Sequence, residues 1–586
     1  MGNTHSSNLN SNRHRSIRRQ RSAPILSKIS LGCTSAGSSV FSSDSSEATS
    51  RFFVKEKSTP SDQLSEEPPP FSPPTRAHVS AAHVAYAPTS DVLATDASLA
   101  YDQFLHEFPE YRLTWIVDSL RRTDYRRLER VGETYVDYMG GSLYPESLIR
   151  VHTEFLSENV LGNTHSVSNS SKLSLQCSED ARGAILMFFK APPDYTVIFT
   201  PNASGALKLV GESYPFTGGS SYVLGSDSHN SIHGIREFAT NRGASVHYVP
   251  STHHGGFEPT LAKNILLRNR PRSKDLTPSL FAFTGQSNIT NSKNPLSILD
   301  YASSLGYHTL LDAAALAPTS PISLTENPVD AMAVSFYKMF GYPTGVGALV
   351  VKKSFLRQLK RPWFAGGTVD VVQVPGNIVT RAHHLHEQFE DGTINYLTLS
   401  AVTDGLRFLS AYLPFLPVRL SCLTGYLCDS LARLRHETSE IPVVRILSRR
   451  PSKRIRSIGE QSDAGSTVSV IFSFPSGEMM PNSFIEYAAS QKNISLRTGC
   501  MCNPGGAAAI LNIEDDMKRL YPGVTLKDFE EFMGRELGVV RISLGLGSNF
   551  QDVWNVIQFA SSMGNESSRR TLWDSWTEAS GVGQAI

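Results

Sequence analysis

The sequence predicts an α/β protein with a large, mostly parallel, seven-stranded sheet domain and a smaller α+β domain. Between residues 195 and 353, short apolar runs typical of strands alternate with segments of helical length. Gly, Pro, Asp or Ser bounds each run, and such runs are typical of strands that helices cover on both faces. A second set of strand and helix signals after residue 400 predicts the smaller domain. The seven runs are YTVIFT at 195, SYVLGSD at 221, VHYVP at 246, SLFAFTG at 279, HTLLDAA at 308, AMAVSFYK at 331 and GVGALVV at 345.

Residues 1–100 differ from the rest of the chain in composition. They are rich in Ser, Pro, Arg and Thr, include PPPFSPP at 68–74 and lack a periodic apolar pattern. Such a segment cannot bury enough surface to fold alone, so we predict a disordered arm. The other predicted parts are an N-terminal segment that joins the small domain (101–170), the large domain (171–400), the small domain (401–565) with a basic, aperiodic surface insertion near 447–465, and a frayed tail (566–586).

Charge and cysteine content exclude several classes of protein. The 586 residues carry 55 basic and 54 acidic side chains, and this net charge of +1 argues against a nucleic-acid-binding protein. No apolar run reaches the roughly 18 to 20 residues that a membrane-spanning helix needs. The cysteines are too few for a disulfide framework and no apolar secretory segment precedes them, so we expect a reducing, cytoplasmic location. They are Cys33, Cys177, Cys422, Cys428, Cys500 and Cys502.

The start of the chain, Met1-Gly2-Asn3-Thr4-His5-Ser6, fits an N-myristoylation signal with Gly2 as the acceptor. The basic residues that precede the first acidic residue, Asp44, could supply the second attraction that a single acyl chain needs at a membrane. A cytoplasmic protein that associates with a membrane is therefore expected. An Arg- and Ser-rich start also fits a mitochondrial presequence, and a solvated tail with a chance motif is a third interpretation. The basic residues are Arg13, Arg15, Arg18, Arg19, Arg21 and Lys28.

Lys338 closes the run AMAVSFYK and precedes the glycine-rich turn GYPTGVG, so its ammonium group is expected at a strand end in a confined site. Desolvation there would lower the pKa of Lys338 toward the range in which the free amine attacks a carbonyl. A solvated lysine at a strand end is the alternative interpretation of this residue alone. Polar residues at other strand ends favour the first interpretation.

Three of these strand ends carry such residues. Asp312 closes the run HTLLD, and a carboxylate at that position can keep a pyridinium nitrogen protonated. Ser204 and Gly205 stand where a strand turns into a helix, whose first N–H groups can bind a phosphate. An N-cap is the more common role of a serine such as Ser204. His229 follows the next strand and could stack on a ring or move a proton.

Three motifs carry a family resemblance: SFYKMFGYPTGVGAL at 335, FEDGTINY at 389 and LRTGCMCNPGGAA at 496. With them, the segment from about 130 to 560 resembles the aminotransferase-like domain of eukaryotic molybdenum cofactor sulfurases. That domain is similar to bacterial cysteine desulfurases and belongs to the class V pyridoxal-phosphate enzymes. The motifs occur in the family's order, each in its expected strand or loop context. The resemblance implies a pyridoxal-phosphate enzyme of fold type I, the aspartate aminotransferase type.

The resemblance also implies roles for individual residues. Lys338 would bind the cofactor as a Schiff base and move protons, Asp312 would pair with the ring nitrogen, and His229 would stack over the ring. Arg497 would bind the substrate carboxylate, which suits a planar bidentate donor, and Cys502 would be the nucleophile. The remaining cofactor contacts would come from Asn288 at the phenolate oxygen, from Ser204, Ser335 and Tyr337 at the phosphate, and from Thr368 of a second subunit in a homodimer.

The implied reaction gives the cysteine motif a purpose. When L-cysteine is joined to the cofactor and Lys338 removes its α-proton, the bond between the β-carbon and sulfur becomes labile. Cys502 then takes the sulfur as a persulfide, alanine is left, and the sulfur passes to an acceptor. A mobile Gly- and Pro-containing loop beside an arginine suits such a thiolate. A metal site at Cys500 and Cys502 is the alternative, but no further Cys or His cluster has the spacing of zinc ligands, so no metal is expected.

The sequence departs from the family pattern in three places. Ala507 stands where the family usually has a further cysteine, and YVDYMGGSLYP at 135 and GNTHSVSNSS at 162 differ from the usual motifs near the substrate entrance. Full-length relatives continue into a barrel domain that binds the molybdenum cofactor, whereas this sequence ends before it, so the acceptor is expected to be molybdenum cofactor on a separate protein.

Two other functions stay open at this point. The first is a pyridoxal-phosphate carbon–sulfur lyase, or another class V enzyme that acts by β-elimination on a specialised substrate. Loss of Cys502 separates this function from desulfuration, because a lyase does not need that thiol. The second is an inactive, membrane-tethered binding protein, against which the complete set of Lys338, Asp312, His229 and Arg497 argues.

Overall fold

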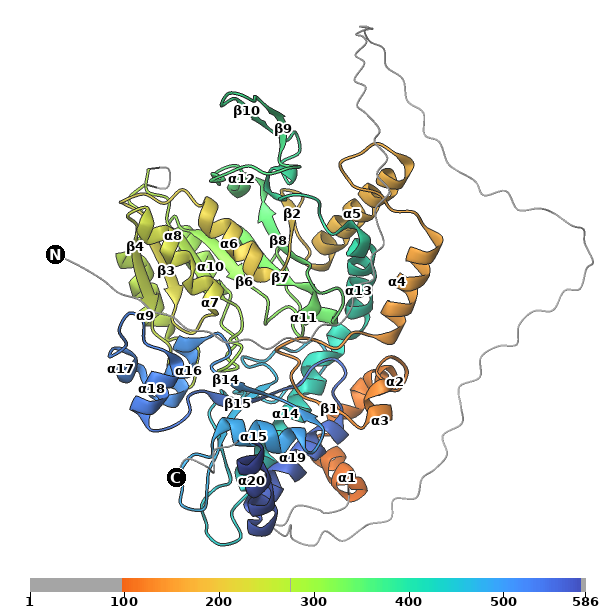
Figure 1. The fold of residues 1–586 in the computed structure, drawn as a ribbon, viewed down its shortest axis with the longest axis vertical. Helices are drawn as coiled ribbons and strands as arrows, with labels where there is room; N and C mark the ends of the chain where they lie inside the picture. The colour runs from red at the N-terminus through yellow and green to blue at the C-terminus, as the bar shows by residue number, and fades with distance from the viewer. Residues whose placement is uncertain (1–96, 274–275, 581–586) are drawn as a thin grey trace, which may run out of the picture. The chain divides into compact units, whose positions relative to one another are not determined.

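The computed structural model describes residues 97–273 and 276–580. All seven predicted runs form strands of one sheet, in the order β2-β8-β7-β6-β5-β3-β4 (Figure 1). Neighbouring strands from β7 to β4 are parallel, and β8 runs antiparallel to both of its neighbours. The prediction of a mostly parallel, seven-stranded sheet is confirmed. The strands are β2 (Tyr195–Thr200), β3 (Ser221–Gly225), β4 (Ser245–Val249), β5 (Leu280–Thr284), β6 (His308–Asp312), β7 (Ala331–Ser335) and β8 (Gly347–Lys352).

Helices cover both faces of this sheet because both faces of its strands are apolar. Successive residues alternate between two buried clusters, as Leu310 and Leu311 of β6 do. The carboxyl ends of the parallel strands meet at one edge, where their loops gather. One face is covered by α6 (Ala203–Ser213), α8 (Ile235–Asn241) and α12 (Lys353–Leu356), and the other by α5 (Asn169–Phe188), α9 (Pro259–Arg268), α10 (Ser297–Ser304) and α13 (Leu399–Tyr412).

A four-stranded antiparallel sheet, in the order β11-β12-β15-β14, forms the second core. The first described segments join it: β1 (Thr134–Tyr135) pairs in parallel with β13 (Ile494–Ser495). In addition, the ring of Phe104 in α1 (Ala97–Glu107) lies 5.2 Å from that of Phe550. The elements of this part are β11 (Val444–Ile446), β12 (Thr467–Phe472), β14 (Arg497–Gly499), β15 (Val539–Ser543), α14 (Leu416–Arg433), α15 (Asn482–Ser490), α16 (Pro504–Leu511), α17 (Glu514–Met517), α18 (Leu526–Met533) and α19 (Phe550–Gly564).

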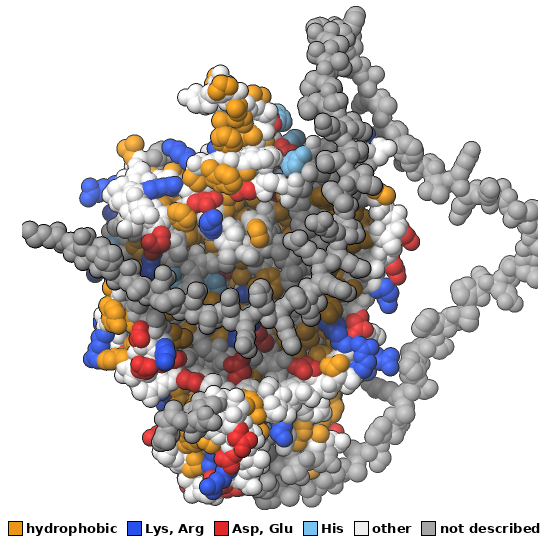
Figure 2. Space-filling model, in the orientation of Figure 1, with side chains coloured by type: hydrophobic (Ala, Val, Ile, Leu, Met, Phe, Trp, Pro, Cys, Tyr) orange, Lys and Arg blue, Asp and Glu red, His pale blue; other side chains and the backbone are white. Residues whose placement is uncertain are grey.

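A β-hairpin of β9 (Val369–Val372) and β10 (Val379–Arg381) projects from the large sheet domain (Figure 1). Its apolar side chains are largely exposed, with 57% of Val371, 85% of Val374 and 60% of Ile378 accessible. Figure 2 shows these hydrophobic side chains gathered on the projection. An exposed apolar projection of this kind is typical of a surface that contacts another protein.

The predicted frayed tail is wrong for residues 566–580, which form helix α20 (Glu566–Ser580). Trp573 and Trp576 pack on Phe484 of α15, with ring centroids 4.9 and 5.6 Å away. The Arg569 side chain is also buried. The helix is therefore held by tertiary contacts between its aromatic residues and α15, which the local sequence pattern does not reveal.

The segment 447–465 is more than the predicted surface insertion. Ile455 and Ala464 are buried, and backbone hydrogen bonds tie the segment to the loop after β5. The Arg449 N–H donates to the Thr290 carbonyl at 2.8 Å, and the Gly465 N–H donates to that of Asn291 at 3.0 Å. The segment thus supports a loop at the carboxyl edge of the large sheet.

One described stretch, Tyr396–Arg433, is long and apolar enough to cross a membrane by length and composition. The expectation that no such stretch exists is therefore too strict. The stretch contains α13 and α14, joined by a short 3-10 turn, and 56% of its most apolar window is buried inside the protein. Buried helices of a protein core meet the same criterion, and we interpret these two as core helices.

Candidate active site

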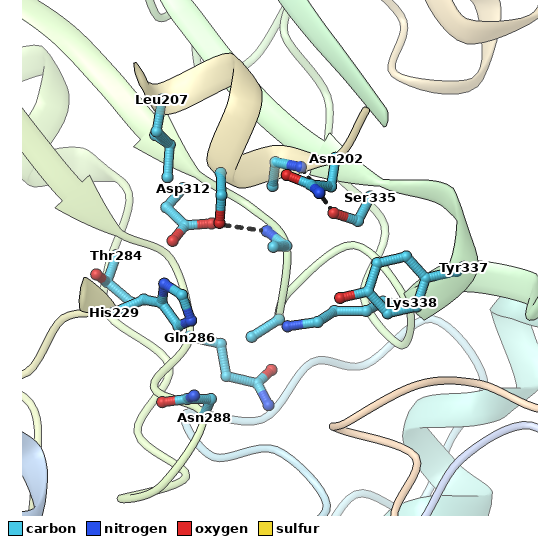
Figure 3. Close-up of a pocket in the computed structure, with 14 residues that line it drawn as sticks. Asn202, Leu207, His229, Thr284, Gln286, Asn288, Asp312, Ser335, Tyr337 and Lys338 are labelled. Atoms are coloured by element: carbon cyan, nitrogen blue, oxygen red, sulfur yellow. Dashed lines mark hydrogen bonds between the residues drawn. The ribbon is translucent and has the colours of Figure 1, made fainter. Parts of the chain in front are cut away.

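A cavity of about 120 Å³ lies at the carboxyl edge of the large sheet, beside the start of α6 (Figure 3). Its walls come from the loops after β3, β5, β6 and β7, as expected for this sheet type. The predicted site residues that line it are Ser204, His229, Asn288, Asp312, Ser335, Tyr337 and Lys338, and the polar residues that the sequence did not single out are Asn202, Thr284 and Gln286.

Lys338 lies in α11 (Phe336–Phe340), a short helix that begins directly after β7. The strand is therefore three residues shorter than the sequence run suggested. Burial lowers the pKa of the Lys338 amine, the positive charges of Arg541 and Arg497 lower it further, and the carboxylate of Asp312 opposes them. The site thus favours the free amine, the form that attacks carbonyl groups.

Asp312 and His229 reach the cavity from the carboxyl end of β6 and from the loop after β3. Asp312 is the last residue of β6, is 6% exposed, and accepts a hydrogen bond from the Ala314 N–H at 3.0 Å. His229 begins α7 (Asn230–His233), and its Nδ1 accepts the Ser231 N–H at 3.1 Å. Burial lowers the pKa of His229, and this favours a neutral ring in the cavity.

The start of α6 supplies a polar wall for the cavity. Asn202 is the N-cap, because its Oδ1 accepts the Gly205 N–H at 2.9 Å. Ser204 is therefore not the cap, and its hydroxyl lies 2.6 Å from that of Ser231. The hydroxyl of Ser335 accepts the Ala203 N–H at 2.8 Å.

This arrangement leaves the Ser204 and Ser335 hydroxyl groups beside a helix N-terminus, where an anionic group is stabilised. Gly205 contributes its N–H to the cap and does not line the cavity. Burial raises the pKa of Tyr337, so its hydroxyl remains a proton donor.

Gln286 lies two residues before Asn288 in the same loop and was missed by the sequence analysis. Its side chain is 1% exposed, and neither its amide oxygen nor its amide nitrogen has a hydrogen-bond partner within the described protein. A buried amide without a partner is costly, so its presence in the cavity wall points to a polar ligand. The one sequence signal that could have identified Gln286 was its position in the same loop as Asn288.

Arg497 and Arg541 are opposite each other on β14 and β15 and share one carboxylate. The Arg497 Nε lies 3.0 Å from Asp137 Oδ2, and the Arg541 Nη2 lies 2.5 Å from Asp137 Oδ1. Half of the Arg497 side chain is exposed, whereas Arg541 is buried. Neither lines the cavity, but both charges act on Lys338. Arg541 was missed because an arginine inside an apolar strand gives no local functional signal.

Cys502 is exposed and lies in a tight turn from Cys500 to Asn503, closed by an Asn503 N–H to Cys500 carbonyl bond of 2.9 Å. Its own carbonyl accepts the N–H of Asn230, the residue after His229, at 2.7 Å. The predicted nucleophile therefore stands at the rim of the cavity, outside its lining. Burial raises the pKa of the Cys500 thiol.

Thr368 lies away from the cavity, and the structure does not describe Gly2. Thr368 is buried, and its hydroxyl donates to the Ala365 carbonyl at 2.8 Å within its own loop. Among residues 97–273 and 276–580, no group of three or more His, Cys, Asp or Glu side chains could hold a metal ion.

A partly buried lysine with a lowered pKa and a buried aspartate, at the carboxyl edge of a seven-stranded, mostly parallel sheet, define a pyridoxal-phosphate enzyme of fold type I. Residues 134–556 match the family model described as Aminotransferase class-V. The chain belongs to the class V aminotransferase family.

Similar proteins are known from several organisms. The molybdenum cofactor sulfurase of Solanum lycopersicum is 32% identical, over 79% of this chain and 59% of the relative. That of Bos taurus is 33% identical, over 75% of this chain and 51% of the relative. The chain thus spans little more than half the length of these curated relatives.

Solved structures confirm the fold type. The apo structure of a cysteine desulfurase from Thermococcus onnurineus NA1 has a TM-score of 0.60 with 19% identity, covering 76% of this chain and 97% of that one. A cysteine desulfurase from Escherichia coli has a TM-score of 0.57 with 19% identity, also over 76% and 97%. At this level of identity the likeness concerns the fold.

Class V aminotransferases use pyridoxal phosphate, and the cavity fits this cofactor. The hydroxyl groups of Ser204 and Ser335, beside the start of α6, suit the phosphate. The carboxylate of Asp312 suits a protonated ring nitrogen, and the partnerless amide of Gln286 can bond a polar oxygen. Pyridoxal phosphate is therefore the cofactor that this donor set holds.

Proposed function

We propose that the chain is a pyridoxal-phosphate-dependent cysteine desulfurase of the molybdenum cofactor sulfurase type, which converts L-cysteine to L-alanine and carries the sulfur as a persulfide on Cys502. The observation that carries this proposal is the position of Cys502. Cys502 itself is exposed, and its turn is tied by hydrogen bonds to Asn230 and Asn288, at the rim of the cavity that contains Lys338. The names of the sulfurase relatives and desulfurase structures support it.

When bound, pyridoxal phosphate supplies an electron sink that acidifies the α-carbon of an amino acid and weakens the adjacent β-bond. Lys338 would hold the cofactor covalently and then move the α-proton, because burial favours its free amine. Asp312 would keep positive charge on the ring nitrogen. The neutral ring of His229 would pack beside the cofactor, and Asn288 would bond its phenolate oxygen.

Positive charge near Lys338 suits a substrate with a carboxylate. Arg497 and Arg541 present two guanidinium groups, which their shared partner Asp137 neutralises only in part. We propose that Arg497, the more exposed of the two, binds the L-cysteine carboxylate and that Arg541 strengthens the local positive potential.

The sulfur transfer balances without an external oxidant. The thiolate of Cys502 attacks the substrate sulfur, so that a sulfur–sulfur bond forms as the carbon–sulfur bond breaks. The β-carbon retains the bonding electrons and takes up a proton, which gives alanine. The terminal persulfide sulfur then passes to a nucleophilic acceptor and restores the Cys502 thiol. We propose molybdenum cofactor as that acceptor.

A homodimer is part of the proposal. Thr368 directly precedes the hairpin of β9 and β10, whose exposed apolar side chains provide a surface for a second subunit. In such a dimer Thr368 would approach the cofactor phosphate of the partner site. The mass of the native enzyme in solution, measured by light scattering, tests this assembly, and a monomer would contradict it.

A carbon–sulfur lyase is the second candidate, because the cavity lining is complete without Cys502. In that case Lys338 and Asp312 alone would promote β-elimination, and L-cysteine would give pyruvate, ammonia and sulfide.

Product analysis of the purified enzyme with L-cysteine and a thiol reductant separates the two candidates. The desulfurase forms alanine and sulfide in equal amounts, and Cys502→Ala abolishes both while the colour of the lysine-bound cofactor remains. Cys177→Ala, which removes a buried thiol of α5, serves as the matched control and keeps full activity. Pyruvate formation that survives Cys502→Ala would establish the lyase instead.

A further inference from the structure

Asp227, two residues before His229, is the centre of a buried hydrogen-bond network that none of the roles above uses. It is 5% exposed. Its Oδ1 accepts the hydroxyl of Ser287 at 2.6 Å and the side-chain amide of Asn503 at 2.7 Å. Its Oδ2 accepts the hydroxyl of Thr290 at 2.7 Å and the N–H of Gly256 at 3.3 Å. The carboxylate is therefore fixed by four donors from three separate loops.

Asn503 connects this network to the nucleophile turn. Its side chain is completely buried, and its Oδ1 accepts the Gly506 N–H at 3.0 Å, which caps α16. Its Nδ2 donates to Asp227 and, at 3.1 Å, to the side-chain oxygen of Asn288. An amide is required here, because the position needs an acceptor for the helix cap and donors for Asp227 and Asn288.

The turn needs such support because its backbone is unfavourable. Met501 and Cys502 have φ values of 56° and 54°, in the left-handed region that residues with a Cβ avoid. The carbonyl groups of Cys500, Met501 and Cys502 each accept a hydrogen bond. That of Cys500 accepts the Asn503 N–H, that of Met501 accepts the Asn288 side chain at 2.7 Å, and that of Cys502 accepts the Asn230 N–H. Strained turns of this kind persist where surrounding contacts fix them.

We propose that Asn503, anchored on Asp227, is a positioning residue that holds the Cys502 turn against the cavity rim for sulfur transfer. Asn288 belongs both to the cavity lining and to this network, so the position of the turn is coupled to the cofactor side of the site. The inference rests on the proposed function, since it assigns a role in bringing Cys502 to the substrate sulfur.

Asn503→Asp tests the proposal with little change of shape. The carboxylate keeps the acceptor that caps α16, but it loses both donors and faces the buried carboxylate of Asp227. We expect formation of the Cys502 persulfide to slow by about 100-fold, the loss that a displacement near 1 Å can cause. Cofactor colour at Lys338 should stay close to wild type, whereas the melting temperature should fall, because two buried carboxylates then face each other.

The double variant Asp227→Asn/Asn503→Asp exchanges donor and acceptor across the same pair. In the double variant the Cys502 persulfide should form at least about tenfold faster than in Asn503→Asp, because a neutral amide again faces a carboxylate. Additive losses in the double variant would overturn the proposal, since they would mean that the two residues act separately.

Hydrogen exchange of the amides at 500–503 measures the position of the turn without turnover. Exchange should be faster in Asn503→Asp than in wild type and should slow again in the double variant. Faster exchange with an unchanged persulfide rate would overturn the inference. If wild type forms no persulfide on Cys502, the proposed function fails. Faster exchange in Asn503→Asp would then still identify Asn503 as the residue that holds the turn. Unchanged exchange would refute this positioning role as well.

Discussion

Lys338 shows how burial prepares a single side chain for chemistry. Lys338 belongs to α11 and lines the cavity, where burial together with Arg541 and Arg497 lowers the pKa of its amine, while Asp312 raises it. The negative charge of Asp312 therefore limits how far the pKa of the lysine falls. Since the same aspartate is expected to pair with the cofactor ring, one carboxylate acts on both partners of the bond that joins lysine to cofactor.

The rate at which the apo-enzyme takes up pyridoxal phosphate should report this lowered pKa. The free amine is the reactive form, so the rate should rise with pH to a midpoint below the ordinary lysine value of 10.5. In Asp312→Asn the midpoint should move to still lower pH, because the charge that raises the pKa is gone. Absorbance of the bound cofactor measures the rate, with Lys338→Ala as the variant that takes up none. A midpoint at or above 10.5 would contradict the prediction.

Sequence reasoning could find residues whose place follows from a strand end. Lys338, Asp312 and His229 line the cavity as expected, because the ends of parallel strands meet at one edge. It could not find Gln286 or Arg541, whose significance depends on what surrounds them. A buried amide without a partner, or two arginines on one carboxylate, becomes visible only when distant segments pack together.

At the scale of elements, Glu390 joins three parts of the large sheet domain. Its carboxylate lies 2.8 and 2.7 Å from the two terminal nitrogens of Arg182 in α5 and accepts the Phe199 N–H of β2 at 2.7 Å. Both charged side chains are buried. The FEDGT motif thus anchors the loop before α13 to a helix and a strand, a structural role beside its value as a family signature.

Glu390→Gln should destabilise the protein by about 3 kcal/mol, because the buried Arg182 charge then keeps only the exposed carboxylate of Glu179 as a counter-charge. Urea unfolding of the purified protein measures the difference. Asp429→Asn is the matched control, since the side chains of Asp429 and of its ion-pair partner Arg450 are 44% and 45% exposed, and this pair should contribute at most about 1 kcal/mol. An equal decrease in the free energy of unfolding of both variants would show that the buried ion pair stabilises the protein no more than the exposed one.

The elements themselves were predictable where the local pattern alone decides them. All seven strands of the large sheet were found, because strands buried on both faces appear as short apolar runs. Helix α20 was missed because Trp573 and Trp576 are stabilised by contact with Phe484, some 90 positions away in the chain. Likewise, the polar composition of 447–465 concealed its backbone bonds to the loop after β5.

At the scale of the molecule, the site is built by both sheets. The large sheet supplies Lys338, Asp312 and the cavity, while Arg541 and the Cys502 turn come from the second sheet and the loop that leaves it. Direct bonds join the two: the Arg541 Nη1 donates to the Asn288 carbonyl at 3.2 Å. Movement of one part relative to the other would therefore change the distance between nucleophile and cofactor, and folding of both is required for activity.

We propose that the whole enzyme is a cytoplasmic protein that associates with membranes through myristoylation of Gly2, the residue exposed when Met1 is removed. One myristoyl chain gives only weak, reversible binding, and each Arg or Lys near an anionic membrane adds about 1 kcal/mol. Gly2→Ala should therefore move the enzyme from the membrane fraction to the soluble fraction. Replacing Arg18 and Arg19 by Ala should release part of it.

Cell fractionation followed by immunoblotting checks this prediction, and Asn3→Ala, next to the acceptor, is the matched control that should stay on the membrane. High salt should release some of the wild-type protein, because it screens the arginines and leaves the acyl chain in place. A distribution that Gly2→Ala leaves unchanged would contradict the proposal. A mitochondrial location of both wild type and Gly2→Ala, lost when Arg18 and Arg19 are replaced, would instead identify the arm as a presequence. Import into mitochondria depends on the positive charge of the presequence and not on Gly2.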